Sequence, residues 1–265
     1  MDRLPGSPEV PQELRTEYAD WSWKVAWQYG PPALTYRLSH ETEGVRFLKM
    51  AAADGFPSLD DEADRMRWAI DYLPVPVVIQ RGSNRGITWL VTRALPGRDA
   101  TDPAWATDPE PLVRILAKAL RAFHEAPVKE CPFDFRLEPA LAHARRRLEE
   151  GRIQPDRDFH PEFGHLSAEE AIAHLERTRP ASERLVVCHG DYCLPNVLIE
   201  AGAASGFVDL GELGVADHWW DLAVATWSVT WNLGPGHEDL FLQEYGAEWD
   251  HDRVDFYRLL YEVVS

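Results

Sequence analysis

Two short stretches in the second half of the chain contain the residue types that phosphoryl transfer requires. In the first, His189, Asp191 and Asn196 have the H-x-D-x-x-x-x-N spacing of a kinase catalytic loop and directly follow an apolar run. In such a loop the aspartate accepts or orients the proton of the acceptor hydroxyl, and the asparagine binds a metal ion. A His-Gly-Asp sequence alone is typical of a turn. The asparagine five residues after the aspartate, followed by a second apolar run, favours the catalytic interpretation.

The second stretch, Val208-Asp209-Leu210-Gly211, lies eighteen residues beyond Asp191. Asp209 has the place of the magnesium-binding aspartate in a D-x-G motif, and the glycine permits a sharp turn of the chain. By itself Asp-Leu-Gly is a weak turn signal. Strands that begin near Asn196 and end near Asp209 would bring these residues and Asp191 to one end of a hairpin. Two carboxylates and an amide can share Mg²⁺ there.

A lysine in the first half of the chain completes the order expected of a kinase. Lys49 lies in the strand-like run Arg46–Met50. On the third strand of a kinase sheet, a lysine contacts the α- and β-phosphates and is held by an acid on the following helix. Asp61 or Glu62 could be that acid. Taken alone, an exposed strand lysine is the commoner meaning, so the prediction depends on the order of the three motifs.

The elements that must position these residues change in type along the chain. Residues 1–95 read as strands with one inserted helix, Leu59–Tyr72, because β-branched and aromatic runs are separated by Gly and Pro. The expected strands are Trp23–Tyr29, Leu34–Ser39, Val45–Ala51, Val75–Arg81 and Ile87–Thr92, with tight connections at 30–32 and 82–86.

The rest of the chain is predicted to be mainly helical. Pro111–Glu125 carries one apolar helical face, and Ser167–Glu170 is a capping box that opens another helix. Short strands are expected at Leu185–Cys188, Val197–Glu200 and Gly206–Leu210, the last two joined by residues 201–204. We therefore predict an α+β, two-lobed, protein-kinase-like fold. Residues 1–95 form a nucleotide-binding N-lobe, and residues 96–265 a mainly helical C-lobe with the catalytic loop, metal loop and substrate cleft.

Composition limits the possible partners. The 265 residues include 44 acidic and 27 basic side chains, a net charge of −17, and a 45% hydrophobic share that is ample for a packed core. Such a charge opposes binding to nucleic acid or to anionic membranes and favours a cationic small molecule. Three cysteines without paired spacing indicate no disulfide framework or zinc site. With no apolar run long enough for a signal or a membrane span, we expect a soluble cytoplasmic protein. We also expect a monomer or a weak dimer.

Other conspicuous side chains have simpler interpretations. The scattered histidines lack metal-ligand spacing, and Arg145-Arg146-Arg147 near Glu149 predicts a solvated helix face. Four tryptophans at helical spacing predict core positions, with a sugar-stacking wall formed by the last two as the alternative. These four are Trp219, Trp220, Trp227 and Trp231.

The two motif stretches, Leu185–Asn196 and Ser205–His218, resemble the aminoglycoside phosphotransferases. The resemblance is greatest to the enzymes that act on a 3′-hydroxyl, and it extends to the streptomycin 3″-enzymes. It spans nearly the whole chain. Further matching segments are Trp89–Gly97, Leu116–Val128, Trp220–Ala223 and Phe256–Leu260.

The resemblance implies an antibiotic-resistance kinase that uses ATP or GTP with Mg²⁺ to phosphorylate an aminoglycoside hydroxyl. A kinase for another hydroxylated natural product, and a non-catalytic nucleotide-binding relative, are the alternatives. The implied roles are Asp191 as catalytic base, Asn196 and Asp209 as magnesium ligands, Lys49 with Glu62 as the phosphate-positioning pair, backbone at Thr92 and Ala94 for adenine, and Asp221 as a brace for the catalytic loop. An exposed acid in the first turn of a helix is the alternative for Asp221.

The substrate end differs from the family pattern. Asp156, Asp158 and Glu162 in a loop, together with Glu262, are the candidate acids for a cationic substrate. Tyr261 replaces an acid of the 3′-enzymes, so we expect weaker binding of the usual 3′-substrates.

Two further departures lie near the nucleotide. Pro31 stands where the family has a serine beside the phosphates, and it has no N–H to donate. Glu212 replaces an arginine of the metal loop. Both put the rate of turnover in question.

Overall fold

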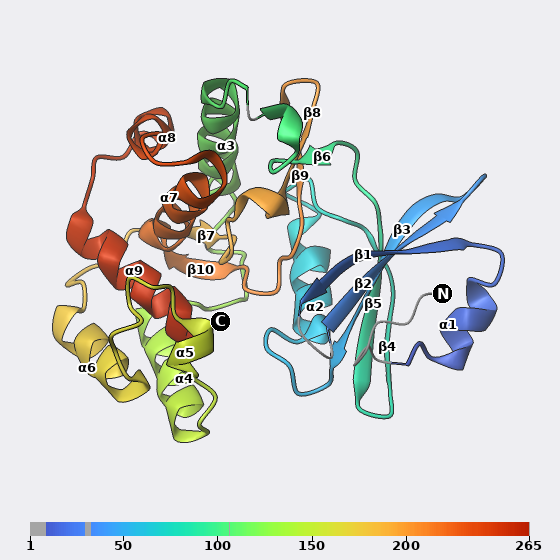
Figure 1. The fold of residues 1–265 in the computed structure, drawn as a ribbon, viewed down its shortest axis with the longest axis horizontal. Helices are drawn as coiled ribbons and strands as arrows, with labels where there is room; N and C mark the ends of the chain where they lie inside the picture. Colours follow the sequence, from blue (N-terminus) through green and yellow to red (C-terminus); the bar gives the residue numbers. More distant parts are fainter. Residues whose placement is uncertain (1–8, 30–32, 106, 265) are drawn as a thin grey trace. The chain divides into compact units, whose positions relative to one another are not determined.

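The computed structural model describes residues 9–29, 33–105 and 107–264 and divides the chain into two compact units. The first comprises Met1–Pro96 with Gly206–Gly211, and the second Gly97–Ser205 with Glu212–Ser265. The fold is α+β and kinase-like, with a β-rich smaller lobe and a larger, mainly helical one (Figure 1). The sequence-based boundary left residues 206–211 in the second domain, whereas their contacts group them with the first unit.

The first unit is built on a five-stranded antiparallel sheet in the order β1-β2-β3-β5-β4 (Figure 1). The strand β4 begins and ends three residues later than predicted, because the turn after it contains only two residues. Arg85 and Gly86 have φ values of 50° and 80°, which suit a two-residue turn between twisted strands. The elements of this unit are α1 (Gln12–Glu17), β1 (Ser22–Tyr29), β2 (Ala33–His40), β3 (Gly44–Ala52), α2 (Leu59–Ala69), β4 (Val78–Asn84) and β5 (Ile87–Arg93).

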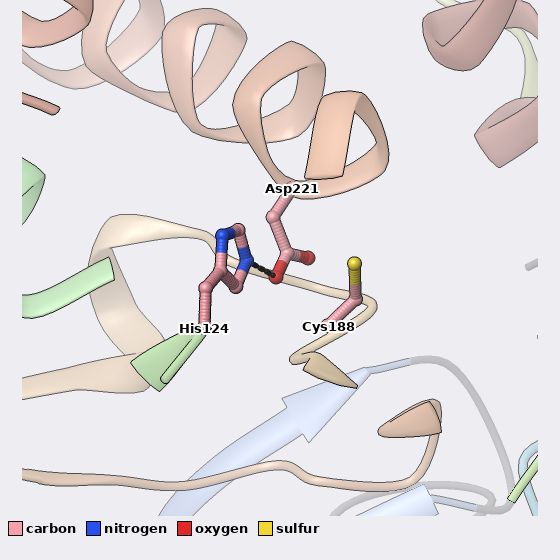
Figure 2. A group of neighbouring side chains, drawn as sticks. All are labelled: His124, Cys188 and Asp221. Carbon is pink, nitrogen blue, oxygen red and sulfur yellow. Dashed lines mark hydrogen bonds and ion pairs between the residues drawn. The ribbon is translucent and has the colours of Figure 1, made fainter. Parts of the chain in front are cut away.

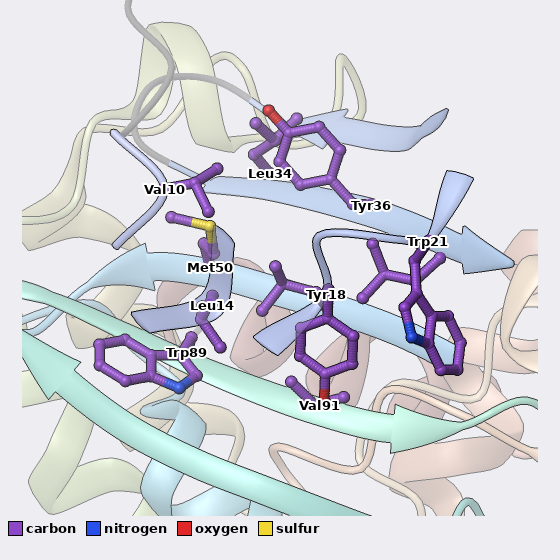
Figure 3. Packing of buried hydrophobic residues seen from close by; sticks show 11 residues of the cluster. Val10, Leu14, Tyr18, Trp21, Leu34, Tyr36, Met50, Trp89 and Val91 are labelled. Carbon is purple, nitrogen blue, oxygen red and sulfur yellow. The ribbon is translucent and has the colours of Figure 1, made fainter. Parts of the chain in front are cut away.

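One face of this sheet is covered by α1 and the segment around it. Leu14 of α1 and Tyr18, the residue after this helix, belong to the same buried cluster as Met50 and Val91 of the sheet (Figure 3). Along β3, Leu48 and Met50 are buried in this cluster. Because side chains alternate across a strand, the residue between them projects from the opposite face of the sheet. That residue is Lys49.

The helix α2 begins with a side-chain cap. The Ser58 hydroxyl accepts the backbone N–H of Asp61 at 3.0 Å. The buried positions of α2 include Glu62, Ala63 and Met66, so one acid of its first turn lies on the buried face. The helix ends at Ala69, three residues before the predicted end.

The second unit is organised around α7, which is buried on all sides over its first three turns. An apolar helix without a polar face is expected at the centre of a helical domain, and α7 contacts α8, α9 and β7. The helices of this unit are α3 (Glu110–Phe123), α4 (Leu137–Glu149), α5 (Pro155–Asp158), α6 (Ala168–Thr178), α7 (His218–Leu233), α8 (Glu238–Tyr245) and α9 (His251–Val264), with 3-10 turns at Pro103–Trp105 and Leu194–Asn196.

Two small sheets complete the chain. The antiparallel pair β7 (Leu185–Cys188) and β10 (Gly214–Asp217) lies beneath α7, and β8 (Val197–Glu200) pairs with β6 (Arg98–Asp99) and β9 (Ala203–Phe207). The strand predicted at 206–210 begins and ends three residues earlier, at Ala203–Phe207. Ala201 and Gly202, with φ values of 50° and 79°, make a two-residue turn, so β9 starts at Ala203.

Two further sequence predictions concern local features. The capping box at Ser167 and Glu170 is confirmed, with both reciprocal hydrogen bonds formed. The cysteines are thiols: Cys188 is buried, and Cys131 and Cys193 are half-buried. Among the helices of the described residues, none is long and apolar enough to cross a bilayer.

Candidate active site

Lys49 is the centre of an ion-pair group in the first unit. Its Nζ donates to Glu62 Oε2 at 2.9 Å and also pairs with Asp209 Oδ1. Burial would lower the pKa of Lys49, but the two carboxylates outweigh burial and raise it. The lysine therefore keeps its positive charge. Of the two acids left open by the sequence, Glu62 is the partner, because Asp61 instead accepts the hydroxyl of Ser58.

Asp209 is held by a segment that packs closely on the first unit. Phe207 donates its N–H to the Pro74 carbonyl at 2.9 Å. A Cβ added to Gly211 would lie 2.4 Å from a side-chain carbon of Pro57, so no larger residue fits there without a shift. Asp209 itself has φ of 63°, a conformation that costs energy for a residue with a side chain. Backbone strain of this kind is concentrated at functional sites.

Asp191 and Asn196 are joined within the predicted catalytic loop. Asn196 Nδ2 donates to the Asp191 side chain at 2.8 Å and to its backbone carbonyl at 2.9 Å. The 3-10 turn Leu194–Asn196 reverses the chain and returns the asparagine to the aspartate. Since the amide nitrogen is committed, the amide oxygen is the atom that Asn196 can offer to a cation.

Asp221 braces this loop, as the resemblance implied. Its Oδ2 accepts the N–H of His189 at 2.7 Å, and its Oδ1 accepts the N–H of Gly190 at 2.9 Å. The side chain is fully buried, so the alternative of an exposed helix acid is wrong. Gly190 has φ of 90°, and a Cβ there would lie 2.5 Å from Glu212, so glycine is required.

His124 extends the brace, and the sequence analysis assigned it no role. Figure 2 shows its ring against Asp221. The ring Nε2 lies 2.9 Å from Asp221 Oδ2, and the ring Nδ1 lies 2.8 Å from the hydroxyl of Tyr245. Burial lowers the pKa of His124, so the ring is neutral. Because a carboxylate can only accept, Nε2–H donates to Asp221 and Nδ1 accepts the Tyr245 hydroxyl.

Cys188 stands beside this pair in Figure 2. Ligand atoms of Cys188, His124 and Asp221 lie within 4.8 Å of one another, a spacing that a metal ion could use. Each atom is already used, however, since the thiol donates to the Asp217 carbonyl at 3.3 Å. We therefore interpret the group as structural support for the catalytic loop.

Tyr261 makes a contact that the sequence analysis did not anticipate. Its hydroxyl donates to Asp191 Oδ1 at 3.0 Å. Burial, reinforced by the charge of Asp191, raises the pKa of Tyr261, so the phenol keeps its proton. The two residues are 70 positions apart, and no local pattern connects them.

Three of the four predicted substrate acids, Asp158, Glu162 and Glu262, lie around His160. Glu262 is 7% exposed and accepts the backbone N–H of His160. Burial raises the pKa of Glu262 to about 7, and the charges of Asp158 and Glu162 add to the rise. Glu162 lies 3.9 Å from the His160 ring and is partly exposed. Asp158 accepts the N–H of Gln154 at 2.8 Å.

Aromatic rings lie beside these acids. The Trp227 and Trp231 rings are 4.8 Å apart, and the His160 ring is 4.7 Å from the first and 5.4 Å from the second. Trp227 is buried, as predicted, whereas Trp231 is 48% exposed, so the core prediction is wrong for Trp231. Trp231 lies in the last turn of α7, beyond the turns that are buried.

Thr92 and Ala94, whose backbone is expected to bind adenine, pair with neighbouring strands of the sheet. Thr92 pairs with Phe47 of β3 and Val78 of β4, and Ala94 donates its N–H to the Val45 carbonyl at 3.0 Å. A nucleotide that used the Ala94 N–H would have to replace this bond. The adenine contacts stay a prediction, and Pro31 lies outside the described residues.

The fold, the Lys49–Glu62 pair and the braced Asp191–Asn196 loop define a kinase-like phosphotransferase. Comparison with known proteins agrees. The profile of the phosphotransferase enzyme family matches residues 32–257, and this chain belongs to that family.

Three relatives illustrate the similarity. The aminoglycoside 3′-phosphotransferase of Streptomyces fradiae is 37% identical over 94% of this chain and 97% of its own. The crystal structure of the type VIII aminoglycoside 3′-phosphotransferase has a TM-score of 0.86 at 35% identity, covering 95% of this chain and 97% of its own. The phosphotransferase APH(3″)-Id of Streptomyces rimosus, solved with ADP and streptomycin, has a TM-score of 0.76 at 29% identity, covering 95% and 96%. The resemblance noted from the sequence is confirmed.

Proposed function

We propose that this protein transfers the γ-phosphoryl group of ATP or GTP to a hydroxyl of an aminoglycoside antibiotic, and so confers resistance. The observation that carries the proposal is Asp191, a carboxylate in a buried, braced loop with Asn196 bonded to it. The relatives named above suggest the 3′-hydroxyl as the acceptor.

Lys49 is the residue that we assign to the phosphates of the nucleotide. Its ammonium group is held by the buried Glu62, so it is oriented before a nucleotide arrives. A fixed positive charge stabilises the phosphates and the charge that develops on them during transfer. We assign Thr92 and Ala94 to the adenine as part of this proposal.

We assign Asp209 and Asn196 to Mg²⁺ as part of this proposal. Carboxylate and amide oxygens are the ligands that this hard cation accepts. When bound, Mg²⁺ would neutralise phosphate charge. Asp209→Ala should abolish transfer, with poor rescue by excess Mg²⁺, because the neutral Asn196 alone cannot offset the cation's charge. Full rescue would assign the ligand to another acid, with Glu212 the nearest candidate in sequence.

At the acceptor end, Asp191 orients the substrate hydroxyl and receives its proton. Phosphoryl transfer depends mainly on positioning and on electrostatic stabilisation. The bonds from Asp221 to the loop backbone therefore matter as much as the carboxylate itself.

The region that we assign to the substrate combines acidic side chains with the exposed indole ring of Trp231. We place the amino groups of the substrate near Asp158, Glu162 and Glu262, and a sugar ring or an ammonium group against Trp231. A cation over an indole face gains about 0.5–2 kcal/mol. The net charge of −17 would also steer a polycation toward the protein.

A panel of aminoglycosides tests the proposal by mass spectrometry. Each compound is incubated with the protein, Mg²⁺ and ATP or GTP, and the product is examined for the mass of one added phosphoryl group. Transfer to one or more aminoglycosides supports the proposal. Transfer only to other hydroxylated amines would indicate a different natural-product kinase. Nucleotide binding without transfer to any acceptor would indicate a non-catalytic protein.

A further inference from the structure

Both oxygens of the Asp191 carboxylate are bound by side chains of the same unit. Oδ2 accepts from Asn196 at 2.8 Å, and Oδ1 accepts from the Tyr261 hydroxyl at 3.0 Å. Asn196 is fixed by its additional bond to the Asp191 backbone. Oδ1 is therefore the oxygen whose partner can be exchanged without disturbing the loop.

The Tyr261 contact has the form of an enzyme–acceptor contact. A general base receives a substrate hydroxyl at about 2.6–3.2 Å. Tyr261 offers the same group, an O–H, at such a distance from the same carboxylate. Its neighbour Glu262 belongs to the acids assigned above to the substrate, so the last turns of α9 lie where an acceptor must enter.

We propose that Tyr261 occupies the place of the acceptor hydroxyl on Asp191 until the acceptor displaces it. The inference rests on the proposed role of Asp191. While Tyr261 is in place, its hydroxyl takes up one of the acceptor positions of this oxygen and competes with water for it.

The consequence concerns wasteful hydrolysis of the nucleotide. Without an acceptor, a water oxygen would bond to the γ-phosphorus, the bond between this phosphorus and the bridging oxygen would break, and the water proton would pass to Asp191. The products are a nucleoside diphosphate and phosphate. Tyr261 slows this reaction because its hydroxyl competes with water for Asp191 Oδ1.

The test is phosphate release from ATP with no aminoglycoside present. Tyr261→Phe removes the hydroxyl and keeps the ring, so release should rise about tenfold, the size of one charge-assisted hydrogen bond. The KM for the acceptor should fall or stay constant, because nothing has to be displaced. In Tyr261→Phe combined with Asp191→Asn, release should return to the wild-type level or below, which shows that the effect requires Asp191.

Tyr257→Phe is the matched control. Tyr257 lies one turn earlier on α9, and its buried hydroxyl has no hydrogen-bond partner among the described residues. It should leave phosphate release unchanged, while nucleotide binding and thermal unfolding report whether each variant is folded.

Two results overturn the proposal. If Tyr261→Phe releases phosphate no faster than the wild type, or loses both hydrolysis and transfer, then Tyr261 only orients Asp191. A rise in hydrolysis in a protein that phosphorylates no aminoglycoside would support the role of Tyr261 and would refute the proposed substrate. The two ideas can therefore fail separately.

Discussion

Arg147 donates from its guanidinium group to the carbonyl oxygen of Val264, 2.8 Å away, and so links α4 to the end of α9. This helix end also carries Tyr261 and Glu262. A positive charge is favourable there because helix C-termini are partially negative. The prediction of a solvated face for residues 145–147 is thus wrong for Arg147, which is half-buried and packs against the last turn of α9.

Arg147→Met should loosen this link. We expect a loss of about 1–2 kcal/mol in the free energy of unfolding, the size of a charge-assisted hydrogen bond with a helix-dipole contribution. The kcat should fall more than the affinity for nucleotide, because the end of α9 also carries Glu262, which we assign to the acceptor, whereas Lys49 and Glu62 are untouched. Arg145→Met is the control, since Arg145 pairs with Glu176 at the surface. Equal effects of the two substitutions on thermal unfolding and kcat would contradict the assignment.

Asp191→Asn should separate chemistry from nucleotide binding. The amide cannot take up a proton, so kcat should fall by roughly 10²–10⁴-fold, as for positioned acid–base groups. The dissociation constant of ATP should change little, because Lys49 and Glu62 are untouched. Turnover within a few-fold of the wild type would remove Asp191 from the mechanism.

Asp221→Asn should destabilise the folded protein and also lower the rate of phosphoryl transfer. The buried carboxylate accepts two backbone N–H groups and the His124 ring. An amide offers one oxygen and turns an NH₂ group toward a donor, so the loss should approach the roughly 3–5 kcal/mol of a broken buried charge network. Asp252→Asn, at an exposed position of α9, serves as control and should stay within about 0.5 kcal/mol. Denaturant unfolding that showed equal midpoints for both variants would disprove the brace.

Glu262→Gln should change how stability depends on pH. The pKa of Glu262 is about 7 in the folded protein, against 4.5 for the free side chain. Between these values the folded state holds a proton that the unfolded state has lost, so the free energy of unfolding falls as pH rises. The decrease in the free energy of unfolding is complete above pH 7 and amounts to about 3 kcal/mol at most.

Glutamine keeps an acceptor for the N–H of His160 and never ionises. The variant should match the wild type near pH 4.5 and unfold several degrees higher at pH 8. Glu248→Gln, at an exposed position, should show no such difference. Parallel pH profiles of the melting temperature for Glu262→Gln and wild type would show that Glu262 is ionised normally.

Trp231→Ala tests the exposed ring. If it stacks on the acceptor, the KM for an aminoglycoside should rise by about 3- to 30-fold while the KM for ATP stays constant. Trp231→Phe, which keeps an aromatic face, should recover part of the loss. An unchanged acceptor KM in the alanine variant would leave Trp231 as a surface residue without a role in binding.

Much of the fold was predictable because its signals are local. Alternating apolar residues and Gly-Pro punctuation indicated the five strands of the first sheet within a few residues. The helix α1 was missed because it has six residues and no side-chain cap. The strand β10 was missed because it has four residues, all buried, and its evidence is the pairing with β7.

The active site likewise has some residues that local spacing reveals and others that only long-range contacts reveal. The spacing of Asp191 to Asn196 and the position of Lys49 are visible in the sequence. Lys49 pairs with Glu62 as expected, and Asn196 bonds to Asp191. The contacts of Tyr261 with Asp191 and of His124 with Asp221 join residues 70 and 97 positions apart. Tertiary packing decides such pairs, and no periodicity or motif in either segment specifies the partner.

The three thiols differ enough in environment to be told apart by a chemical reagent. Burial raises the pKa of Cys188 and of Cys193, so neither forms the thiolate that attacks a maleimide or an iodoacetamide. Cys131 lies between α3 and α4 and is partly accessible. A dye supplied under native conditions should therefore attach at one position, and the native chain can carry a fluorescent reporter for ligand titrations without removal of any cysteine.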